Sequence, residues 1–337
     1  TAVTSPIETW SDDFSMAIAG VPSMVNDFTG GSFMETHYHS QFDNDDFYDE
    51  QVYRLHHELF ALLILALDET AVVPLQFSPV AQRIRKGLEQ CREICYRADV
   101  TGQLGDRKQV LLEKIEELET LSDRALRKCR EEYEEIAEYN RNYKQLLRDG
   151  KYDEAEILYG QTRALEQKLL AQFKQEQDAF VRIDWYGNVL YPHEICSTNL
   201  RLLGGAVRNL KEQRLSSALR KLYQVDNNAY AFMFDEQVYR HFTDYVFHQP
   251  RERLKWGYGR LLEHENLYGT VKQLLQKEKT MTESGLTEMD YREDIANLEQ
   301  ACSKLVSSLV NILEQMQKAL PTGVEIIALD LSEDRAP

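Results

Sequence analysis

The chain has 337 residues and a formal net charge of −17, from 56 acidic and 39 basic side chains. Hydrophobic residues make up 43% of the sequence, which is enough for one large domain or for two domains with sizeable cores. The acidic balance argues against a nucleic-acid-binding protein, because binding to phosphates depends on clustered Lys and Arg.

Cysteine content and hydropathy bear on the compartment of the protein. The five cysteines are sparse and odd in number, so they do not predict a disulfide framework. Cys91 and Cys95 are four residues apart in a predicted helix, and we expect them to be buried thiols. This cysteine usage is compatible with the cytoplasm, but the sequence does not determine a compartment. The most apolar stretch, Leu59 to Leu67, is too short to cross a bilayer, which takes about 20 residues.

Two short segments near the start of the chain carry residues typical of a hydrolytic site. The first, Trp10 to Pro22, reads WSDDFSMAIAGVP and has Ser11 and Asp12 near its beginning. The second contains Tyr38 and His39, follows a pair of glycines and precedes a run of carboxylates and a predicted long helix. Histidine is the commonest metal ligand near neutral pH. On spacing alone, however, this segment is more typical of an ordinary surface loop.

In order, spacing and flanking residues, the two segments resemble the co-catalytic zinc exopeptidases, the group of zinc aminopeptidases, glutamate carboxypeptidase and the transferrin receptor. The resemblance implies that His39 is the last protein ligand of one zinc ion, for which a neutral imidazole is suited. It implies that Tyr38 donates a hydrogen bond to the oxyanion of the tetrahedral intermediate. It also implies that Ser11 and Asp12 line the substrate cleft. His37 has no counterpart in the family pattern, and we interpret it as a histidine that does not bind the metal.

Most of the family's two-zinc site has no counterpart in this sequence. The family also needs an upstream His-x-Asp, a bridging aspartate, a glutamate pair that includes the general base, and a further aspartate. The residues before Ser11 contain no histidine and a single carboxylate, Glu8. A catalytic zinc normally has three protein ligands and an open position. We therefore expect the C-terminal part of a larger enzyme, with two zinc ions in the complete parent and none bound tightly by this chain alone.

Residues 1–73 are predicted to be the C-terminal remnant of an α/β peptidase domain. Val21 to Val25 is a candidate buried strand. A helix is predicted from about Tyr48 to Asp68, because apolar residues recur there at steps of three and four. These residues are Val52, Leu55, Leu59, Leu62 or Leu63, and Ala66. Such a helix would pack on a sheet whose other strands are mostly missing from the sequence.

A second, helical domain is predicted over residues 74–337. Its boundary is Pro74 to Pro79, because each proline disfavours helix at the residue before it. Ser78 is the expected N-cap of the next helix, with Pro79 at its first position. The family has a similar connector that enters a helical dimerisation domain, so the resemblance implies a homodimer.

A long antiparallel helical hairpin is expected within this domain, over about residues 107–180. Arg107 to Arg148 contains no proline or glycine, and apolar or small residues recur along it at steps of three and four. These are Leu111, Ile115, Leu118, Leu121, Ala125, Cys129, Tyr133 and Ile136. Asp149 to Lys151 interrupts the pattern, and a second helix is predicted from about Asp153 to Phe180. At 1.5 Å rise per residue, the arm would be about 60 Å long.

The remaining segments are rich in aromatic residues or helical. Ile183 to Pro192 is predicted to be loop or short extended structure. Phe232 to Tyr268 is predicted to be irregular, and its aromatic residues favour core or interface. Within it, Lys255 and Trp256 are the nearest equivalent of a lysine–tyrosine pair that reaches the substrate side chain in the family. A last long helix is predicted from Glu288 to Leu320.

Three functions are compatible with these patterns. The first is a zinc-dependent exopeptidase, an aminopeptidase or a carboxypeptidase, to which this chain supplies one metal ligand, one oxyanion donor and the dimer interface. The second is a receptor-like relative that keeps the fold without the chemistry. The third is a coiled-coil scaffold with a short α/β appendage. The presence of Tyr38 next to His39 favours the first.

Overall fold

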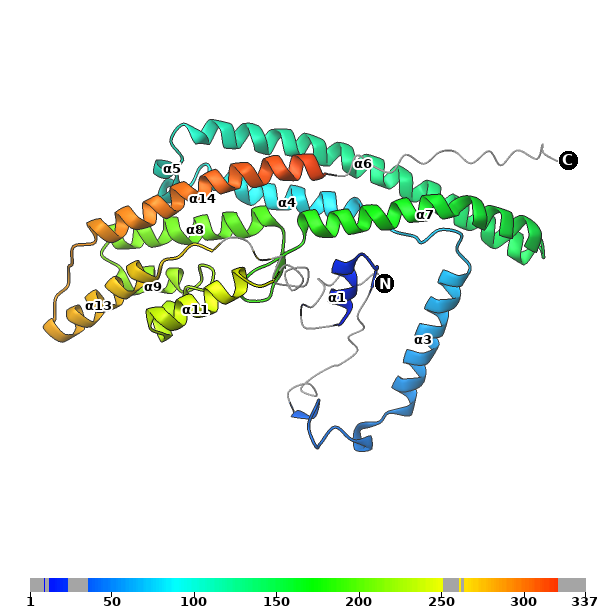
Figure 1. The fold of residues 1–337 in the computed structure, drawn as a ribbon, viewed down its shortest axis with the longest axis horizontal. Coiled ribbons are helices and arrows are strands. Elements are labelled where there is room, and N and C mark those ends of the chain that lie inside the picture. The colour runs from blue at the N-terminus through cyan, green and yellow to red at the C-terminus, as the bar shows by residue number, and fades with distance from the viewer. Residues whose placement is uncertain (1–8, 10–11, 24–35, 251–260, 262–263, 321–337) are drawn as a thin grey trace.

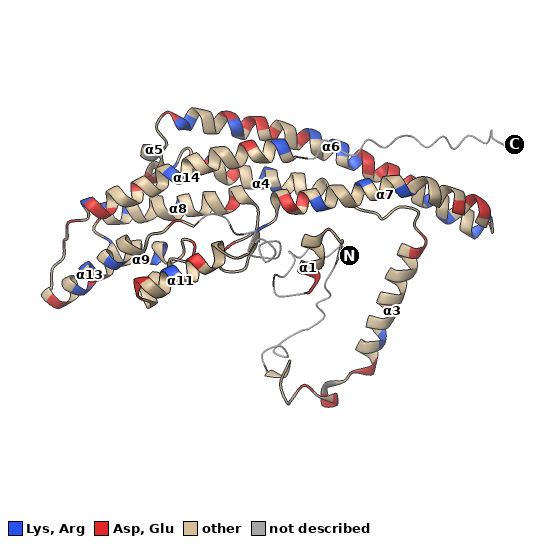
Figure 2. Cartoon of the chain, in the orientation of Figure 1, with Lys and Arg blue, Asp and Glu red and all other residues tan. Residues whose placement is uncertain are grey.

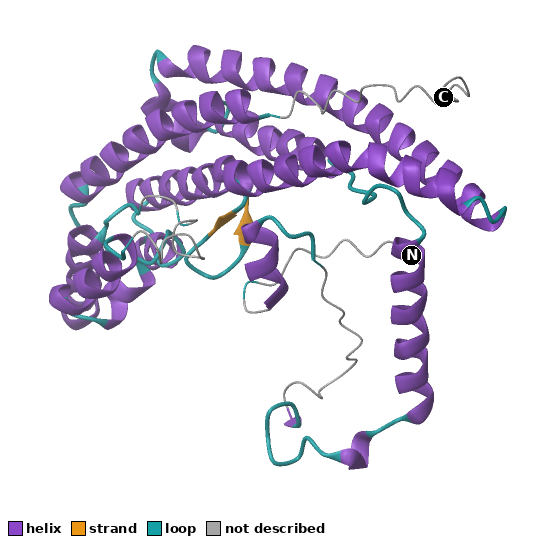
Figure 3. Ribbon diagram, turned by 45° about the vertical axis from the view of Figure 1, so that its right-hand side comes forward, coloured by secondary structure: helices purple, strands orange, loops and turns teal. Residues whose placement is uncertain are grey.

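The structure, a computed structural model, describes residues 9, 12–23, 36–250, 261 and 264–320. Ser11, Lys255 and Trp256 therefore lie outside the described residues. The described part is mainly helical, which confirms the mainly α prediction, and its two short strands pair as an antiparallel hairpin (Figure 3).

Helices follow one another along almost the whole described chain (Figure 1). In order they are α1 (Asp12–Ala19), the 3₁₀ turn η1 (Asp45–Phe47), α3 (Glu50–Asp68), α4 (Ser78–Ile94), α5 (Ala98–Leu104), α6 (Arg107–Arg148), α7 (Tyr152–Phe180), α8 (Pro192–Lys211), α9 (Leu215–Leu222), α10 (Ala229–Met233), α11 (Glu236–Phe247), α13 (Tyr268–Ser284) and α14 (Arg292–Ala319). The hairpin, β1 (Arg182–Ile183) and β2 (Val189–Leu190), lies between α7 and α8.

The long helices have nearly the bounds that the sequence predicts. α6 agrees at both ends, and α7 begins one residue earlier than predicted. α3 begins at Glu50 because the carboxylate of Asp49 accepts the backbone N–H groups of Gln51 and Val52, at 2.9 and 3.1 Å. At α4 the prediction is off by one residue: Phe77 stands at the N-cap position, and Ser78 is already helical.

The main core is a bundle of α4, α6, α8 and α14, with α8 packed against both α4 and α14 (Figure 1). Leu200, Leu203 and Val207 of α8 are fully or almost fully buried in it. α4 and α8 approach so closely that a Cβ atom on Gly87 would lie 2.1 Å from Nε2 of His193. A side chain larger than hydrogen at position 87 therefore has no room unless the two helices move apart.

A second, smaller core joins α6 and α7 to the connector before α4. It contains Cys129 and Ile136 of α6, Leu169 of α7, and Ala71, Val72 and Phe77 of the connector. Asn140 of α6 binds the connector through both backbone groups of Val72, at 2.9 and 3.0 Å. Thr162 of α7 donates to the carbonyl of Ala71 at 2.9 Å. The predicted domain boundary is therefore fastened to the helical part by directional hydrogen bonds.

Two predicted segments differ from the structure. Residues 21–23 form no strand, and Val21 is 52% exposed, because α1 ends at Gly20 and the described part holds no partner strand beside them. Met24 and Val25 lie outside the described residues. The aromatic region from Phe232 to Tyr268 is not irregular throughout, since α11 occupies Glu236–Phe247. The carboxylate of Asp235 caps α11 by accepting the N–H of Val238 at 2.9 Å.

Candidate functional site

Tyr38 and His39 lie together in a tight turn before η1. Their rings stack, with centroids 3.9 Å apart and an interplanar angle of 20°. His39 has a φ of 57°, in the left-handed region, and its N–H donates to the carboxylate of Asp43 at 3.3 Å. A non-glycine residue in this region costs about 1–3 kcal/mol, a strain that is often found at functional sites. Both side chains are exposed, Tyr38 by 40%.

The turn supplies one candidate metal ligand and one candidate oxyanion donor. Within the ranges that the structure describes, no group of three or more His, Cys, Asp or Glu side chains could hold a metal ion. The Nδ1 atom of His37 lies 2.5 Å from the hydroxyl of Thr36. The described residues therefore do not fit a complete zinc site, and any further ligands of a zinc ion on His39 would have to come from elsewhere.

Asp12 is placed apart from this turn. It is the first residue of α1 and is exposed, while Phe14, Ala17 and Ile18 of the same helix are buried. α1 packs against α7, and Gly20 at its end lies close to Lys174 of α7. The turn with Tyr38 and His39 lies at the other end of the chain segment that leads to α3 (Figures 1 and 3). The structure thus does not bring Asp12 and His39 together.

α3, which follows the turn, has no buried residue although it is strongly apolar. Large apolar side chains along it are exposed by 42% to 66%, namely Val52, Leu55, Phe60, Leu62, Ile64, Leu65 and Leu67. Figure 1 shows the helix standing away from the bundle, and Figure 2 shows charged residues mainly near its two ends. No helix in the described part is both long and apolar enough to cross a membrane. α3 is therefore a well-formed helix whose apolar side chains lack a partner among the described residues.

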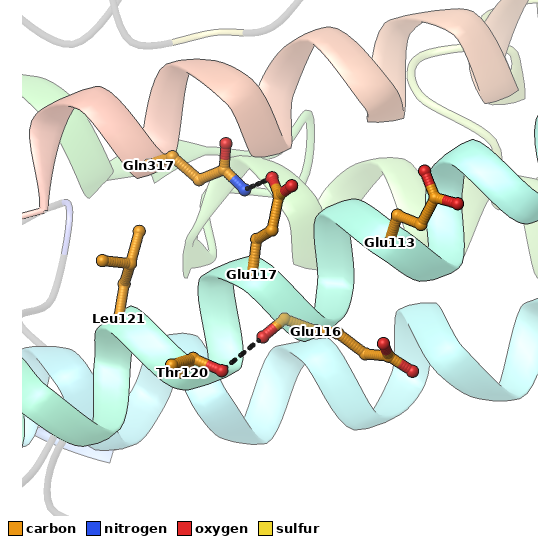
Figure 4. A pocket seen from close by; sticks show the side chains of 6 residues that line it. All are labelled: Glu113, Glu116, Glu117, Thr120, Leu121 and Gln317. Carbon is orange, nitrogen blue, oxygen red and sulfur yellow. Dashed lines mark hydrogen bonds between the residues drawn. The ribbon is translucent and has the colours of Figure 1, made fainter.

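A hollow of about 550 Å³ lies between α6 and α14, but its lining does not suit catalysis (Figure 4). Its polar lining is Glu113, Glu116, Glu117, Thr120 and Gln317. Gln317 donates to Glu117 at 3.0 Å, and this bond together with Lys114 lowers the pKa of the Glu117 carboxyl. Such carboxylates are ionised and solvated, which is typical of a charged helix surface.

Sequence analysis missed a pair of buried carboxyl groups between α6 and α7. Glu132 and Glu176 are 5% and 4% exposed. Burial, partly offset by a hydrogen bond from Gln172, and the neighbouring Glu132 raise the pKa of Glu176 to about 8. The predicted seam of α6 placed Tyr133 inward, but 3.6 residues per turn places Glu132 in line with Cys129 and Ile136. A closer count of that period is the signal that would have found it.

The five cysteines are all buried and free, as expected for Cys91 and Cys95. Burial raises the pKa of both of these thiols, so neither has the thiolate character of a reactive cysteine.

Comparison of the chain with known protein families, with curated proteins and with solved structures found no match. The resemblance to zinc exopeptidases therefore rests on the two segments near the start of the chain alone.

Proposed function

We propose that this chain is the C-terminal portion of a zinc-dependent exopeptidase, an aminopeptidase or a carboxypeptidase that hydrolyses peptide bonds. The observation that carries the proposal is α3, an N-capped and strongly apolar helix without a buried residue, directly after the Tyr38–His39 turn. Full burial of a Leu, Ile or Phe side chain is worth about 1.5–3 kcal/mol. A helix with so many exposed apolar side chains calls for a partner surface, and the sheet of an α/β peptidase domain is such a surface.

In the parent enzyme, each candidate residue has a distinct role. His39 would donate one imidazole nitrogen to one of two zinc ions, and the remaining ligands and the general base would come from the upstream part. Zinc in such a site polarises the scissile carbonyl and lowers the pKa of bound water. Tyr38 would donate its phenol proton in a hydrogen bond to the oxyanion. Ser11 and Asp12 would line the cleft, and Lys255 and Trp256 would contact the substrate side chain.

The helical part has a structural role in this proposal. Residues 1–73 would complete the α/β peptidase domain, and residues 74–337 would form the dimerisation domain, with α6 and α7 as a long hairpin arm. The hydrogen bonds of Asn140 and Thr162 to Ala71 and Val72 support a fixed connection between the two parts.

This chain by itself is expected to show no peptidase turnover and at most weak zinc binding. The reason is that the described residues hold no group of three metal ligands. A panel of aminoacyl and peptidyl substrates, assayed with added zinc, measures this directly. Clear turnover by this chain that is lost in His39→Ala would show that the site is complete here, against the proposal.

The chain is also expected to form a two-fold dimer through its helical part. α10 and α11 expose a cluster of large side chains, with Met233 at 56%, Tyr245 at 49%, Phe242 at 45% and Tyr230 at 36%. The net charge of −17 opposes association, but the Debye length at physiological salt is only about 8 Å. An apolar, self-complementary interface is compatible with that charge.

Light scattering over a concentration series tests the dimer. The paired substitutions Phe242→Ser and Tyr245→Ser should lower the mass to that of the 39.3 kDa monomer. Tyr152→Ser, at a 67% exposed tyrosine on α7, is the matched control. A wild-type mass that stays monomeric up to roughly 100 μM at both low and physiological salt rules the dimer out.

The second candidate function is a catalytically inactive, receptor-like or scaffold protein that acts through its helical part. It is favoured by the separation of Asp12 from the turn with Tyr38 and His39. A parent protein without a His-x-Asp and a Glu-Glu pair upstream would support this candidate over the enzyme.

A further inference from the structure

The β1–β2 hairpin touches two parts of the chain that are far apart in sequence. At its tip, the hydroxyl of Thr9 donates to the carbonyl of Gly187 at 2.9 Å. Gly187 has a φ of 83°, a conformation that favours glycine, and a Cβ there would lie 3.3 Å from the same hydroxyl. Thr9 is two residues before Ser11, so the tip of the hairpin is tied to the segment that carries the proposed cleft residues.

The body of the hairpin holds the two ends of the segment between α11 and α13. The ring of Trp185 packs edge-on against Phe247, at the end of α11, with centroids 5.7 Å apart. On its other side it packs edge-on against His264, with centroids 5.6 Å apart. Ile183 of β1 also pairs with Leu261 in a parallel bridge. Trp185 therefore fixes the separation of Phe247 and His264, which are 17 positions apart in the chain.

A buried polar network holds the second of these ends rigidly. The hydroxyl of Tyr239 lies 3.0 Å from Oδ1 of Asn228 and 2.6 Å from Nε2 of His264. The backbone N–H of Glu265 donates to Asp226, and that of Leu267 donates to Asn228, at 2.9 and 3.0 Å. The side chains of Asp226 and His264 are each only 4% exposed. With so many directional bonds, residues 264–267 have little freedom to shift.

We propose that Trp185 is a positioning residue for substrate recognition: through the β1–β2 hairpin it sets the placement of the segment between Phe247 and His264 relative to the Thr9–Asp12 segment. This inference rests on the proposed function, because it gives the hairpin the task of relating two sets of substrate-binding residues. Ser11 belongs to the first set, and Lys255 and Trp256 to the second. The aromatic contacts carry the link, since each edge-to-face pair adds about 0.5–1.5 kcal/mol beyond its buried area.

Hydrogen exchange on this chain tests the positioning without any activity. In Trp185→Ala, amide exchange in residues 245–249 and 264–267 should speed up about tenfold, because local opening there no longer breaks the aromatic contacts. Trp185→Phe should restore most of the protection, and Tyr152→Ala, at an exposed tyrosine of α7, should leave it unchanged. If Trp185→Ala does not fold, Trp185→Leu takes its place. Exchange equal to that of wild type in the folded variant overturns the proposal.

Kinetics on the full parent enzyme then separate this proposal from the proposed function. Trp185→Ala should raise KM about tenfold with little change in kcat, because it loosens substrate contacts and leaves the metal site intact. A parent without peptidase activity refutes the proposed function but leaves the exchange result standing. A KM equal to that of wild type, with faster exchange, would show that the hairpin positions the segment for something other than substrate, and would overturn the inference.

Discussion

Replacing His39 by alanine in the parent enzyme is expected to abolish peptidase activity and to release one zinc ion per chain. A catalytic zinc is normally held by three protein ligands, so the loss of one imidazole removes a third of its protein ligation. The strained backbone of His39, with its φ of 57°, is consistent with a side chain that must be aimed in a set direction. Zinc content per chain, measured together with turnover, checks this.

Tyr38→Phe should separate the oxyanion donor from the metal ligand. Removing one oxyanion donor costs about 10²- to 10³-fold in kcat, and zinc content should not change. His37→Ala is the matched control, because His37 lies in the same turn and is interpreted as a residue that does not bind metal; it should keep both activity and zinc. Equal zinc content and turnover in His39→Ala and in wild type would exclude His39 as a ligand.

Glu176→Gln is expected to stabilise the chain in alkaline solution. Burial raises the pKa of this carboxyl from an ordinary value of 4.5 to about 8, so the folded state holds a proton that the unfolded state releases. The stabilisation from this proton is complete below about pH 4.5 and is lost as pH rises through 8. Glutamine keeps an acceptor for the hydrogen bond from Gln172 and has no proton to lose.

The expected gain at pH 9 is about 2–4 kcal/mol, against an upper limit near 5 kcal/mol for the whole shift at 1.36 kcal/mol per unit. The groups around Glu176 support the sign, since Glu132 and Cys129 of α6 and Tyr191 before α8 offer no positive charge. His193 has a pKa lowered by burial to about 4, so it stays neutral across the pH range of 7 to 9 used for the test.

Denaturant unfolding at pH 7 and pH 9 measures this effect. Glu154→Gln is the matched control, an exposed carboxyl of α7 paired with Lys151, and it should change stability by less than about 1 kcal/mol at either pH. If wild type and Glu176→Gln lose stability equally between pH 7 and pH 9, the carboxyl is already ionised in the folded state and the proposed burial of its proton is wrong.

The sequence by itself determined the helical elements, because their signals are local. The uninterrupted apolar period from Arg107 to Arg148 and the break at Gly150 predict α6 and α7 within one residue. The aromatic segment with glycine and proline after Phe180 likewise predicts the short extended hairpin. Caps shift the ends by a few residues, as Asp49 does at α3.

Only the tertiary structure decided what each helix faces. The period of α3 predicts an apolar face, but whether that face is covered depends on residues elsewhere, and in the described part nothing covers it. In the same way, Glu132 and Glu176 are charged by composition, and only the approach of α6 to α7 buries them. The link from Thr9 through Gly187 and Trp185 to His264 joins residues far apart in the sequence. Contacts of that range depend on the packing of whole helices, which no local pattern in the sequence specifies.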